Sequence, residues 1–312
     1  MLKHKPIKII VADRINLSGA KVLDKTKFSL TISPNISQND ILKRFLNYHV
    51  LIIRSGRKIT SEFLSKCNFD VIVTASKGVD HIDISYAKKR GIHILSLSEA
   101  NSVSTAEHTL GLIIEAMKRI RVSDEIVRSG NFSNRNFSRR ELEGKKIGII
   151  GIGRVGRRVA NFCKALNMRI LANDIDKSVV EKNSDLKFYP LDQILRNSDI
   201  ITIHIPLTEN NFRYFSADRL SMLKKTAVLI NTSRGEVLDE DYLIYMLREN
   251  KISYACLDVF YNEPEINPEF FSLTNVTLTN HIAGKTRESD IKVSKEIFSL
   301  IRDFYNFHGQ KT

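Results

Sequence analysis

Tryptophan is absent from the 312-residue sequence, and cysteine and proline are scarce, with three and six residues. Cys67, Cys163 and Cys256 lie far apart and lack the CxxC or Cys/His spacing of a zinc site, so the sequence indicates neither a disulfide framework nor a metal centre. No stretch approaches the roughly 18 consecutive apolar residues that a membrane span needs. The N-terminus has too few apolar residues for a signal peptide. We therefore expect a soluble, cytoplasmic protein.

The composition is that of a globular protein, with 42% hydrophobic and 27% charged residues. At this length a single hydrophobic core is near its practical limit, so two domains of roughly 150 residues each are expected. The formal net charge is +13, and residues 118–158 carry 12 Lys and Arg against four Asp and Glu. Such an excess is typical of proteins that bind nucleic acid, a membrane surface or an anionic small molecule.

Short β-branched runs alternate with helix-length amphipathic segments along the chain. Apolar strands separated by helices in this way favour parallel βαβ units that are covered on both faces. In the first hundred residues, strands are expected at 7–12, 50–53, 71–74 and 92–95. A second series of strands is expected at 146–150, 169–173, 200–205, 227–231, 253–258 and 276–279. The sequence therefore predicts an α/β fold with two Rossmann-like, doubly wound domains.

Three further segments do not belong to these alternating units. Residues 101–121 have apolar positions at helical spacing and predict one long helix. Residues 129–140 are polar, basic and rich in Gly and Asn, and predict a boundary. Residues 288–307 predict a final amphipathic helix without a strand partner of its own.

A glycine motif follows the strand at 146–150 and opens a helix. Gly151 permits a tight turn, Gly153 lets the backbone approach a pyrophosphate, and Gly156 allows the helix to pack closely on the strand. The pyrophosphate would bind exposed N–H groups at the positive end of that helix. The motif in this setting predicts a dinucleotide site, and the alternative is an ordinary glycine-rich turn.

Asp174 lies 18 residues after Gly156, at the end of the next strand, where a carboxylate can accept both hydroxyls of the adenosine ribose. Its charge would repel a 2′-phosphate, so the sequence favours NAD over NADP. Arg169 and Lys177 nearby keep NADP open as an alternative. Asp176 is the rival acid, and its place two residues past the strand end predicts a solvated side chain.

Hydride transfer with a nicotinamide requires further groups, and three residues on the C-terminal side of the glycine motif can supply them. Arg234 follows a strand and can hold a carboxylate in two-point contact. His281 also follows a strand, and Glu263 lies in a loop at the same expected sheet edge. A carboxylate bonded to one imidazole nitrogen fixes the tautomer and lets the other nitrogen take a proton. A surface arginine and a structural histidine are the alternatives.

The order and spacing of these motifs resemble the D-isomer-specific 2-hydroxyacid dehydrogenases over nearly the whole chain. Besides the glycine motif, the resemblance is carried by residues 204–208 (HIPLT), 231–235 (NTSRG), 258–264 (DVFYNEP) and 281–284 (HIAG). In the N-terminal half, segments similar to the phosphoglycerate dehydrogenase branch are residues 54–60, 78–83 and 101–107.

The resemblance implies an NAD-dependent oxidoreductase that interconverts a D-2-hydroxy acid and its 2-keto acid. It implies a flavodoxin-like substrate domain of residues 1–100 plus 285–312, an NAD-binding domain of residues 101–284, and a cleft that separates them. The helix at 101–121 would contribute to a homodimer. The favoured activity is that of a 3-phosphoglycerate dehydrogenase of serine biosynthesis, in the short form without a regulatory domain.

The resemblance also assigns site residues. The catalytic residues would be Arg234, Glu263 and His281. The cofactor-binding residues would be Gly151, Gly153, Arg154, Val155, Gly156, Asp174, His204, Ile205, Pro206, Thr232, Ser233, Arg234, Asp258, His281 and Gly284. The substrate-binding residues would be Arg54, Ser55, Lys77, Gly78, Val79, Asn101 and Arg234.

The sequence departs from the family pattern at three positions. Asn280 stands where the family commonly has a proline before the catalytic histidine. Thr74 and Ser76 replace the Arg and Gly that are often found in phosphoglycerate dehydrogenases, so one phosphate-binding cation is missing. The nearby cations that could replace it are Arg54, Arg57 and Lys77.

These departures keep other functions open. The near alternative to 3-phosphoglycerate is the pair glycerate and hydroxypyruvate, or another 2-keto acid. A more distant alternative is a dinucleotide-sensing, corepressor-like binding protein, because the basic segment at 118–158 could touch nucleic acid. Nucleic acid is not the expected partner, because much of that segment belongs to the cofactor loop and the boundary.

Overall fold

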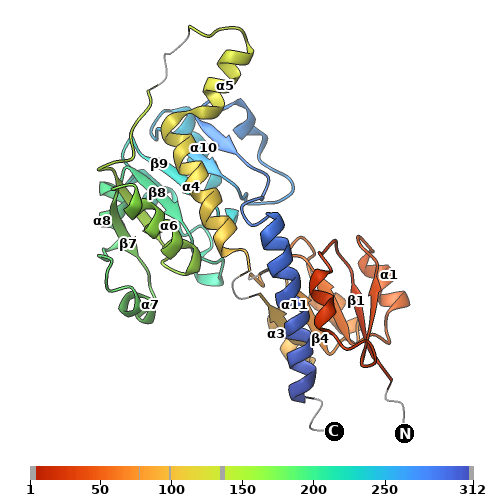
Figure 1. The fold of residues 1–312 in the computed structure, drawn as a ribbon. Coiled ribbons are helices and arrows are strands. Elements are labelled where there is room, and N and C mark those ends of the chain that lie inside the picture. The colour runs from red at the N-terminus through yellow and green to blue at the C-terminus, as the bar shows by residue number, and fades with distance from the viewer. Residues whose placement is uncertain (1–4, 77, 98–99, 134–137, 309–312) are drawn as a thin grey trace. The chain divides into compact units, whose positions relative to one another are not determined.

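The computed structural model describes residues 5–76, 78–97, 100–133 and 138–308 (Figure 1). The chain forms two compact units, the first from residues up to 101 together with those from 285 onward, and the second from residues 102–284. Each unit is built on one parallel sheet flanked by helices, which confirms the α/β fold. Within the described ranges, none of the helices has the length and apolarity that crossing a membrane requires.

The first unit contains a parallel sheet of five described strands in the order β2-β1-β3-β4-β5. This is the flavodoxin-like order of a doubly wound sheet. The strands are β1 (Ile7–Val11), β2 (Phe28–Ile32), β3 (Val50–Ile53), β4 (Val71–Thr74) and β5 (His93–Ser96). The helices are η1 (Ser18–Val22), α1 (Gln38–Arg44), α2 (Ser61–Lys66), α3 (Ile84–Lys89) and α11 (Arg287–His308).

Helix α11 packs on one face of this sheet, so the two ends of the chain share a core (Figure 1). Its Ile297 and Ile301 are fully buried in one cluster with Ile9 of β1. The helix also lies directly on η1, where a Cβ on Gly19 would stand 2.3 Å from the backbone oxygen of Ser294. The Oγ atom of Ser294 accepts a hydrogen bond from the Gly19 amide at 2.8 Å.

The second unit contains a parallel sheet of six described strands in the order β11-β10-β9-β8-β6-β7. These strands are β6 (Lys146–Ile150), β7 (Arg169–Asn173), β8 (Ile200–Ile203), β9 (Val228–Asn231), β10 (Tyr254–Leu257) and β11 (Val276–Leu278). The helices are α4 (Ser102–Lys118), α5 (Ile120–Arg128), α6 (Arg154–Ala165), α7 (Lys177–Lys182), α8 (Leu191–Asn197), η2 (Glu209–Asn211), α9 (Ala217–Ser221), η3 (Gly235–Val237), α10 (Glu240–Arg248) and η4 (Pro268–Ser272).

The strand order of the second unit reverses between β6 and β8, which is the switch point of a Rossmann-like sheet. Phe188 pairs with Ala172 of β7 as a single bridge and occupies the place of a further strand beyond β7. Chains of this class bind ligands beyond the carboxyl ends of their strands at the switch point. The expected cofactor loop and the residues after β8 both lie at this point.

Helices cover both faces of the second sheet (Figure 1). On one face, Ile113 of α4 and Val159 of α6 are fully buried against the strands. On the other face, Ile194 of α8 and Leu243 of α10 are fully buried in a second cluster. Burial on both faces explains why the central strands β8, β9 and β10 are buried at every position and do not alternate with exposed polar residues.

The structure corrects the prediction of one long helix at 101–121. Helix α4 ends at Lys118, and α5 starts at Ile120 after Arg119, whose backbone is left-handed with φ 57°. The guanidinium carbon of Arg119 lies 3.4 Å from the ring centre of Tyr254. Because no glycine or proline marks this break, and a contact distant in sequence accompanies it, helical periodicity could not reveal it.

Candidate active site

The glycine motif forms the turn from β6 into α6. Gly151 has φ +91°, and a Cβ there would lie 2.8 Å from the backbone oxygen of His204. A Cβ on Gly156 would lie 1.9 Å from the oxygen of Gly151, so the helix packs directly on the turn. Around Gly153, the N-cap of α6, nothing stands within 4 Å of the Cβ position. The motif thus leaves open the one backbone position that a pyrophosphate would approach.

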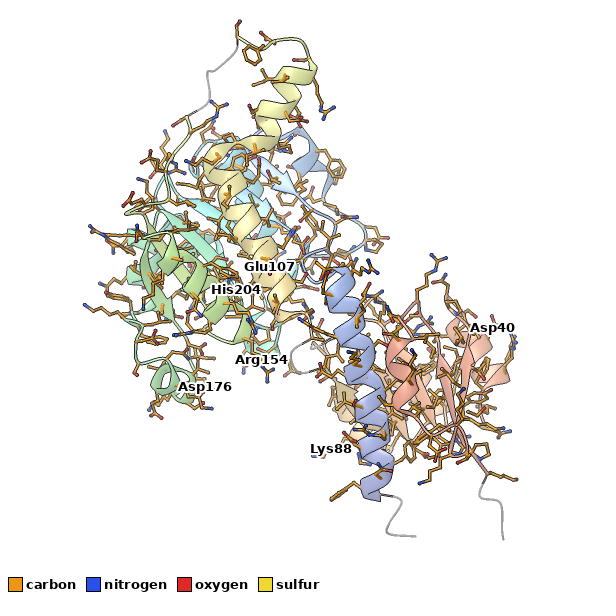
Figure 2. The ribbon with its side chains drawn as sticks, viewed as in Figure 1. Asp40, Lys88, Glu107, Arg154, Asp176 and His204 are labelled. Atoms are coloured by element: carbon orange, nitrogen blue, oxygen red, sulfur yellow. The ribbon has the colours of Figure 1, made fainter. Side chains whose placement is uncertain are left out.

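Asp174 lies just after β7, beside the glycine turn. Its Oδ2 atom accepts from the amide of Ile152 at 2.7 Å, and its Oδ1 atom accepts from the amide of Asp176 at 2.9 Å. Asp176 is exposed and caps α7 by accepting from the amide of Ser178 (Figure 2). The carboxylate that adjoins the turn is therefore the predicted one, Asp174, and the pair of turn and acid fits the adenosine end of NAD.

Residues 204–206 follow β8 at the switch point. Burial lowers the pKa of His204 to about 3, so its ring is neutral. Its Nε2 atom lies 3.0 Å from the hydroxyl of Thr202. The strand ends two residues earlier than expected, at Ile203, and Ile205 and Pro206 continue as loop. Figure 2 shows His204 and Arg154, which opens α6, both in the second unit.

The loop after β9 carries Arg234, and Asn231 determines its shape. Asn231 is fully buried; its Nδ2 atom donates to the oxygen of Arg234 at 2.7 Å. Its Oδ1 atom accepts from the amide and the hydroxyl of Ser233, at 3.0 and 2.8 Å. The hydroxyl of Thr232 lies 2.9 Å from that of Thr109 in α4. The arginine thus projects from a loop that buried polar groups hold in place.

His281 and Glu263 form a hydrogen-bonded pair. Nδ1 of His281 donates to Oε2 of Glu263 at 2.6 Å. Because an ionised carboxylate only accepts, the bond places a proton on Nδ1 and leaves Nε2 to exchange a proton with a substrate. The side chains of His281 and Glu263 are 38% and 33% exposed, so the pair is open to small molecules.

The electrostatics of the pair suit acid–base chemistry. Burial alone would raise the pKa of Glu263, but the hydrogen bond and the charge of His281 outweigh burial and lower this pKa below its ordinary value. The amide of Phe260 also donates to Oε1 of Glu263 at 3.0 Å. Glu263 is therefore ionised at neutral pH and can stabilise an imidazolium beside it.

Asp258 holds the segment that carries His281. Its fully buried Oδ1 atom accepts from the hydroxyl of Thr279 at 2.6 Å and from the amide of Ile282 at 2.9 Å. Its Oδ2 atom accepts from the amide of Ala283 at 2.9 Å. His281 has a left-handed backbone with φ 54°, which this network supports. The resemblance implied a cofactor contact for Asp258, which stays a prediction; the structure shows that its carboxylate orders this loop.

Gly235 brings the Arg234 loop against the loop of Glu263. A Cβ on Gly235 would lie 1.9 Å from the carbonyl carbon of Phe260, so only a glycine allows this contact. The loops of Arg234, Glu263 and His281 follow β9, β10 and β11, which are neighbours in the sheet. The structure thus places the three predicted catalytic residues on adjacent loops at the edge where such sheets bind ligands.

The remaining cofactor assignments also lie in the second unit. Val155 is partly buried in the core that α6 forms with the sheet. Gly284, the last residue of this unit, directly follows the Ala283 amide that Asp258 holds. Sequence reasoning did not single out Asn231 or Gly235 as site residues, although both belong to the NTSRG motif, because their partners come from other loops or from their own backbone.

The expected substrate-binding residues other than Arg234 belong to the first unit. Nη2 of Arg54 lies 3.4 Å from Asp290, and Nη1 donates to the backbone oxygen of Arg14 at 3.0 Å. Arg57 forms a largely buried ion pair with Asp13 at 2.7 Å. Both cations are therefore already partnered by acids.

Other residues assigned to substrate binding lie near the end of β4. The hydroxyl of Thr74 lies 2.9 Å from that of Ser76 and 3.0 Å from Nε2 of His81. The hydroxyl of Ser76 donates to the oxygen of Gly78 at 2.8 Å. Lys77 lies outside the described residues. The further assigned residues are Ser55 in the turn after β3, Val79, and Asn101 directly before α4.

The chain is similar to several known proteins. The family model for the D-isomer specific 2-hydroxyacid dehydrogenase NAD binding domain matches residues 110–283. A D-3-phosphoglycerate dehydrogenase of Archaeoglobus fulgidus is 33% identical over 92% of this chain and 55% of its own length. The chain therefore spans about half the length of such curated relatives.

Shorter relatives match over most of their length. A glyoxylate reductase of Pyrococcus horikoshii is 34% identical over 89% of this chain and 86% of its own. Among solved structures, a D-lactate dehydrogenase of Aquifex aeolicus, complexed with NAD and lactic acid, has a TM-score of 0.83. It is 29% identical and covers 96% of this chain and 95% of its own.

Proposed function

We propose that this chain, which belongs to the D-isomer specific 2-hydroxyacid dehydrogenase family, interconverts a D-2-hydroxy acid and its 2-keto acid with NAD. Its second unit is an NAD-binding domain, and we assign substrate binding in part to the first unit. The observation that carries the proposal is the His281–Glu263 hydrogen bond, which joins the loops after β11 and β10 beside the loop after β9 that bears Arg234. A proton-exchanging imidazole and a carboxylate-binding guanidinium are the two groups that this reaction needs.

Each catalytic side chain has one task. Arg234 holds the substrate carboxylate by charge-assisted hydrogen bonds. Nε2 of His281 removes the hydroxyl proton during oxidation and returns it during reduction, while Glu263 stabilises the imidazolium. When bound, NAD supplies the acceptor of the hydride that leaves the substrate carbon. The fixed positions of donor and acceptor supply much of the rate enhancement, an effect worth on the order of 7–11 kcal/mol.

Two kinds of substrate are candidates for this reaction. 3-Phosphoglycerate is supported by the relatives named D-3-phosphoglycerate dehydrogenase and by the similarity of residues 54–60 to that branch. A small unphosphorylated 2-keto acid, such as glyoxylate or hydroxypyruvate, is supported by relatives such as the glyoxylate reductase. The ion pairs of Arg54 and Arg57 with acids favour the second, because cations neutralised by carboxylates attract a phosphate weakly. We therefore propose reduction of a small 2-keto acid, with 3-phosphoglycerate as the second candidate.

The decisive experiment is steady-state kinetics with a panel of substrates and both nicotinamide cofactors. Glyoxylate, hydroxypyruvate, pyruvate and 3-phosphohydroxypyruvate are tested for reduction, and the D- and L-hydroxy acids for oxidation. We expect activity with NADH, strict preference for D-isomers, and a higher kcat/KM for the unphosphorylated acids. A preference for the phosphorylated substrate would establish the second candidate, and inactivity with the whole panel would refute the proposed reaction.

We also propose a homodimer formed through α4 and α5. Ile120, Val127 and Phe132 are 54%, 52% and 69% exposed in this region, and a partner copy would cover these apolar side chains. Sedimentation equilibrium should give twice the mass of the 35.6 kDa chain. Replacing Ile120 and Phe132 by Asp should then yield monomers.

The corepressor interpretation gains no support from the basic segment. Arg121 and Arg128 pair with acids one helical turn away in α5, and Arg157 pairs with Asp185. Three of the twelve cations in this segment are thus paired with acids. Salt-sensitive DNA binding in the absence of any reductase activity would favour that interpretation instead.

A further inference from the structure

The loop that carries Glu263 is poorly covered by the rest of the protein. Residues 261–265 are exposed, while Val259 and Phe260 before them are buried. A cavity of about 370 Å³ adjoins the loop, and Tyr261, Asn262 and Glu265 line it. Dense packing therefore does not fix this loop, and its position depends on a few specific contacts.

Those contacts are made by the backbone of Phe260 and Tyr261. Gly235 lies against the carbonyl of Phe260. The amide of Tyr261 donates a hydrogen bond of 2.6 Å to Oε1 of Glu240. The amide of Phe260 donates to Glu263 itself. The amides of two consecutive residues, Phe260 and Tyr261, thus connect Glu240 to the residue that braces His281.

Glu240 occupies an unusual place for an acid. It is the first residue of α10, after the N-cap Asp239, yet it is only 7% exposed. Burial raises the pKa of Glu240 to about 7; the Tyr261 amide opposes this rise, while the carboxyls of Asp241, Glu236 and Glu263 add to it. Arg213 lines the same cavity, and its guanidinium lies 3.8 Å from Asp241. Burying a carboxyl costs stability unless hydrogen bonds compensate for the lost hydration, and the bond from the Tyr261 amide is one of this kind.

We propose that Glu240 is a positioning residue, whose side chain holds the Tyr261 amide and thereby keeps Glu263 directed at Nδ1 of His281. This inference rests on the proposed function, because positioning matters only if the His281–Glu263 pair exchanges protons. The group that matters is the hydrogen-bond acceptor, and not the negative charge. A glutamine at this position should therefore serve, whereas a leucine of similar size should not.

The first test compares Glu240→Gln with Glu240→Leu, and uses Glu249→Gln at the exposed end of the same helix as control. We expect E240L to lower kcat for keto-acid reduction by about tenfold or more, because a small misplacement of a catalytic group costs this much. E240Q and E249Q should stay within about twofold of the parent protein in kcat. The dissociation constant for NADH should be unchanged in all three. Equal activity of E240L and E240Q would overturn the proposal.

A double-mutant cycle separates positioning from damage to the fold. If Glu240 acts through Glu263, then E240L should cost little further activity in a Glu263→Gln background. Additive losses would overturn the proposal, because they would show that Glu240 acts elsewhere. Should E240L fail to fold, Glu240→Ala replaces it; if both fail while E240Q folds, the role is structural and the proposal is wrong.

A spectroscopic measurement keeps this inference distinct from the proposed function. The proton on Nδ1 of His281, bonded to a carboxylate, should give a downfield NMR resonance that disappears in Glu263→Gln. The same resonance should weaken in E240L and persist in E240Q, whether or not any substrate is turned over. A resonance unchanged in E240L would overturn the positioning role, while a kinetically inactive parent protein would refute only the reaction.

Discussion

Gly235 contacts the carbonyl of Phe260 so closely that a Cβ on the glycine would stand 1.9 Å from the carbonyl carbon. This contact joins the loop of Arg234 to the loop of Glu263 through backbone alone. The proposed substrate-binding cation and the proposed brace of the catalytic base therefore lie on loops that meet at one close backbone contact. Any residue with a side chain at 235 must separate the two loops.

We expect Gly235→Ala to lower kcat by about a hundredfold, because moving the loops apart by an ångström is enough for such a loss. Unfolding should also become easier by about 1–3 kcal/mol, the usual cost of overpacking. Gly111→Ala in α4 is the matched control, since nothing lies within 4 Å of its Cβ position. That variant should be as stable as the parent protein or slightly more stable. Chemical denaturation measures the stability of the two variants, and steady-state kinetics measure their kcat. Full activity of G235A would show that the Gly235–Phe260 contact does not position the two loops for activity.

His281→Ala should lower kcat by at least about a hundredfold, the usual contribution of a general base, while NADH binding is largely kept. Glu263→Gln should have a smaller effect, because the imidazole remains but loses its carboxylate partner. Fluorescence titration with NADH supplies the binding measurement. The base is wrongly assigned if the alanine variant turns over at the parent rate.

The pKa of Glu263 lies below its ordinary value of 4.5. The carboxylate therefore stays ionised as the pH falls from 7 to about 5, and should not limit keto-acid reduction in this range. We expect the activity of the parent protein to persist at pH 5. A pH–rate profile measured with saturating NADH is the check, and a decline between pH 7 and 5 that is absent from Glu263→Gln would speak against this assignment.

Asp174→Asn should weaken NADH binding by about tenfold, because a charged hydrogen-bond acceptor to the ribose is worth roughly 1.5–3 kcal/mol. The preference for NADH over NADPH should decrease as well, since the carboxylate no longer repels a 2′-phosphate. Asp176→Asn, which alters only an exposed helix cap, is the control and should leave both dissociation constants unchanged. If the two variants behave alike, Asp174 does not bind the ribose.

The buried carboxyl of Glu240 should make the stability of the protein depend on pH. Its pKa in the folded protein, about 7, lies above the ordinary value of 4.5. A raised pKa means that the folded state binds the proton more tightly, so this contribution is full below about pH 4.5 and is lost as the pH rises through 7. The difference in Tm between Glu240→Gln and the parent protein should therefore change with pH. At pH 8 this difference should favour the variant by a few degrees more than at pH 5, on the order of 4 °C. Thermal melts at both pH values test this, and Glu249→Gln should show no such change.

Much of the fold was predictable because its strands are short, apolar and β-branched. Val50 to Ile53 and Val71 to Thr74 are buried along their whole length, as expected of central parallel strands. The break at Arg119 was not predictable, because it lacks a glycine or a proline and adjoins the ring of Tyr254, which lies far along the chain. The pattern of residues around a position cannot predict a contact with a residue so distant in the sequence.

Some residues of the candidate site could likewise be predicted from the sequence, and others could not. Gly151, Asp174 and Arg234 could be predicted as candidate site residues because each follows a strand within a motif of fixed spacing. Glu240 was missed because an acid at the start of a helix usually stabilises the helix dipole in solvent. Only the fold shows that this acid is buried and bonded to the Tyr261 amide.

Helix α11 has a consequence for how the chain acquires its structure during synthesis. The face of the first sheet that contains Ile9 is completed by Ile297 and Ile301, so it lacks its cover while the ribosome translates the intervening residues. The second unit, residues 102–284, is contiguous and precedes that helix in the chain. In the nascent chain, residues 102–284 should therefore become resistant to proteases before the N-terminal residues of the first unit do.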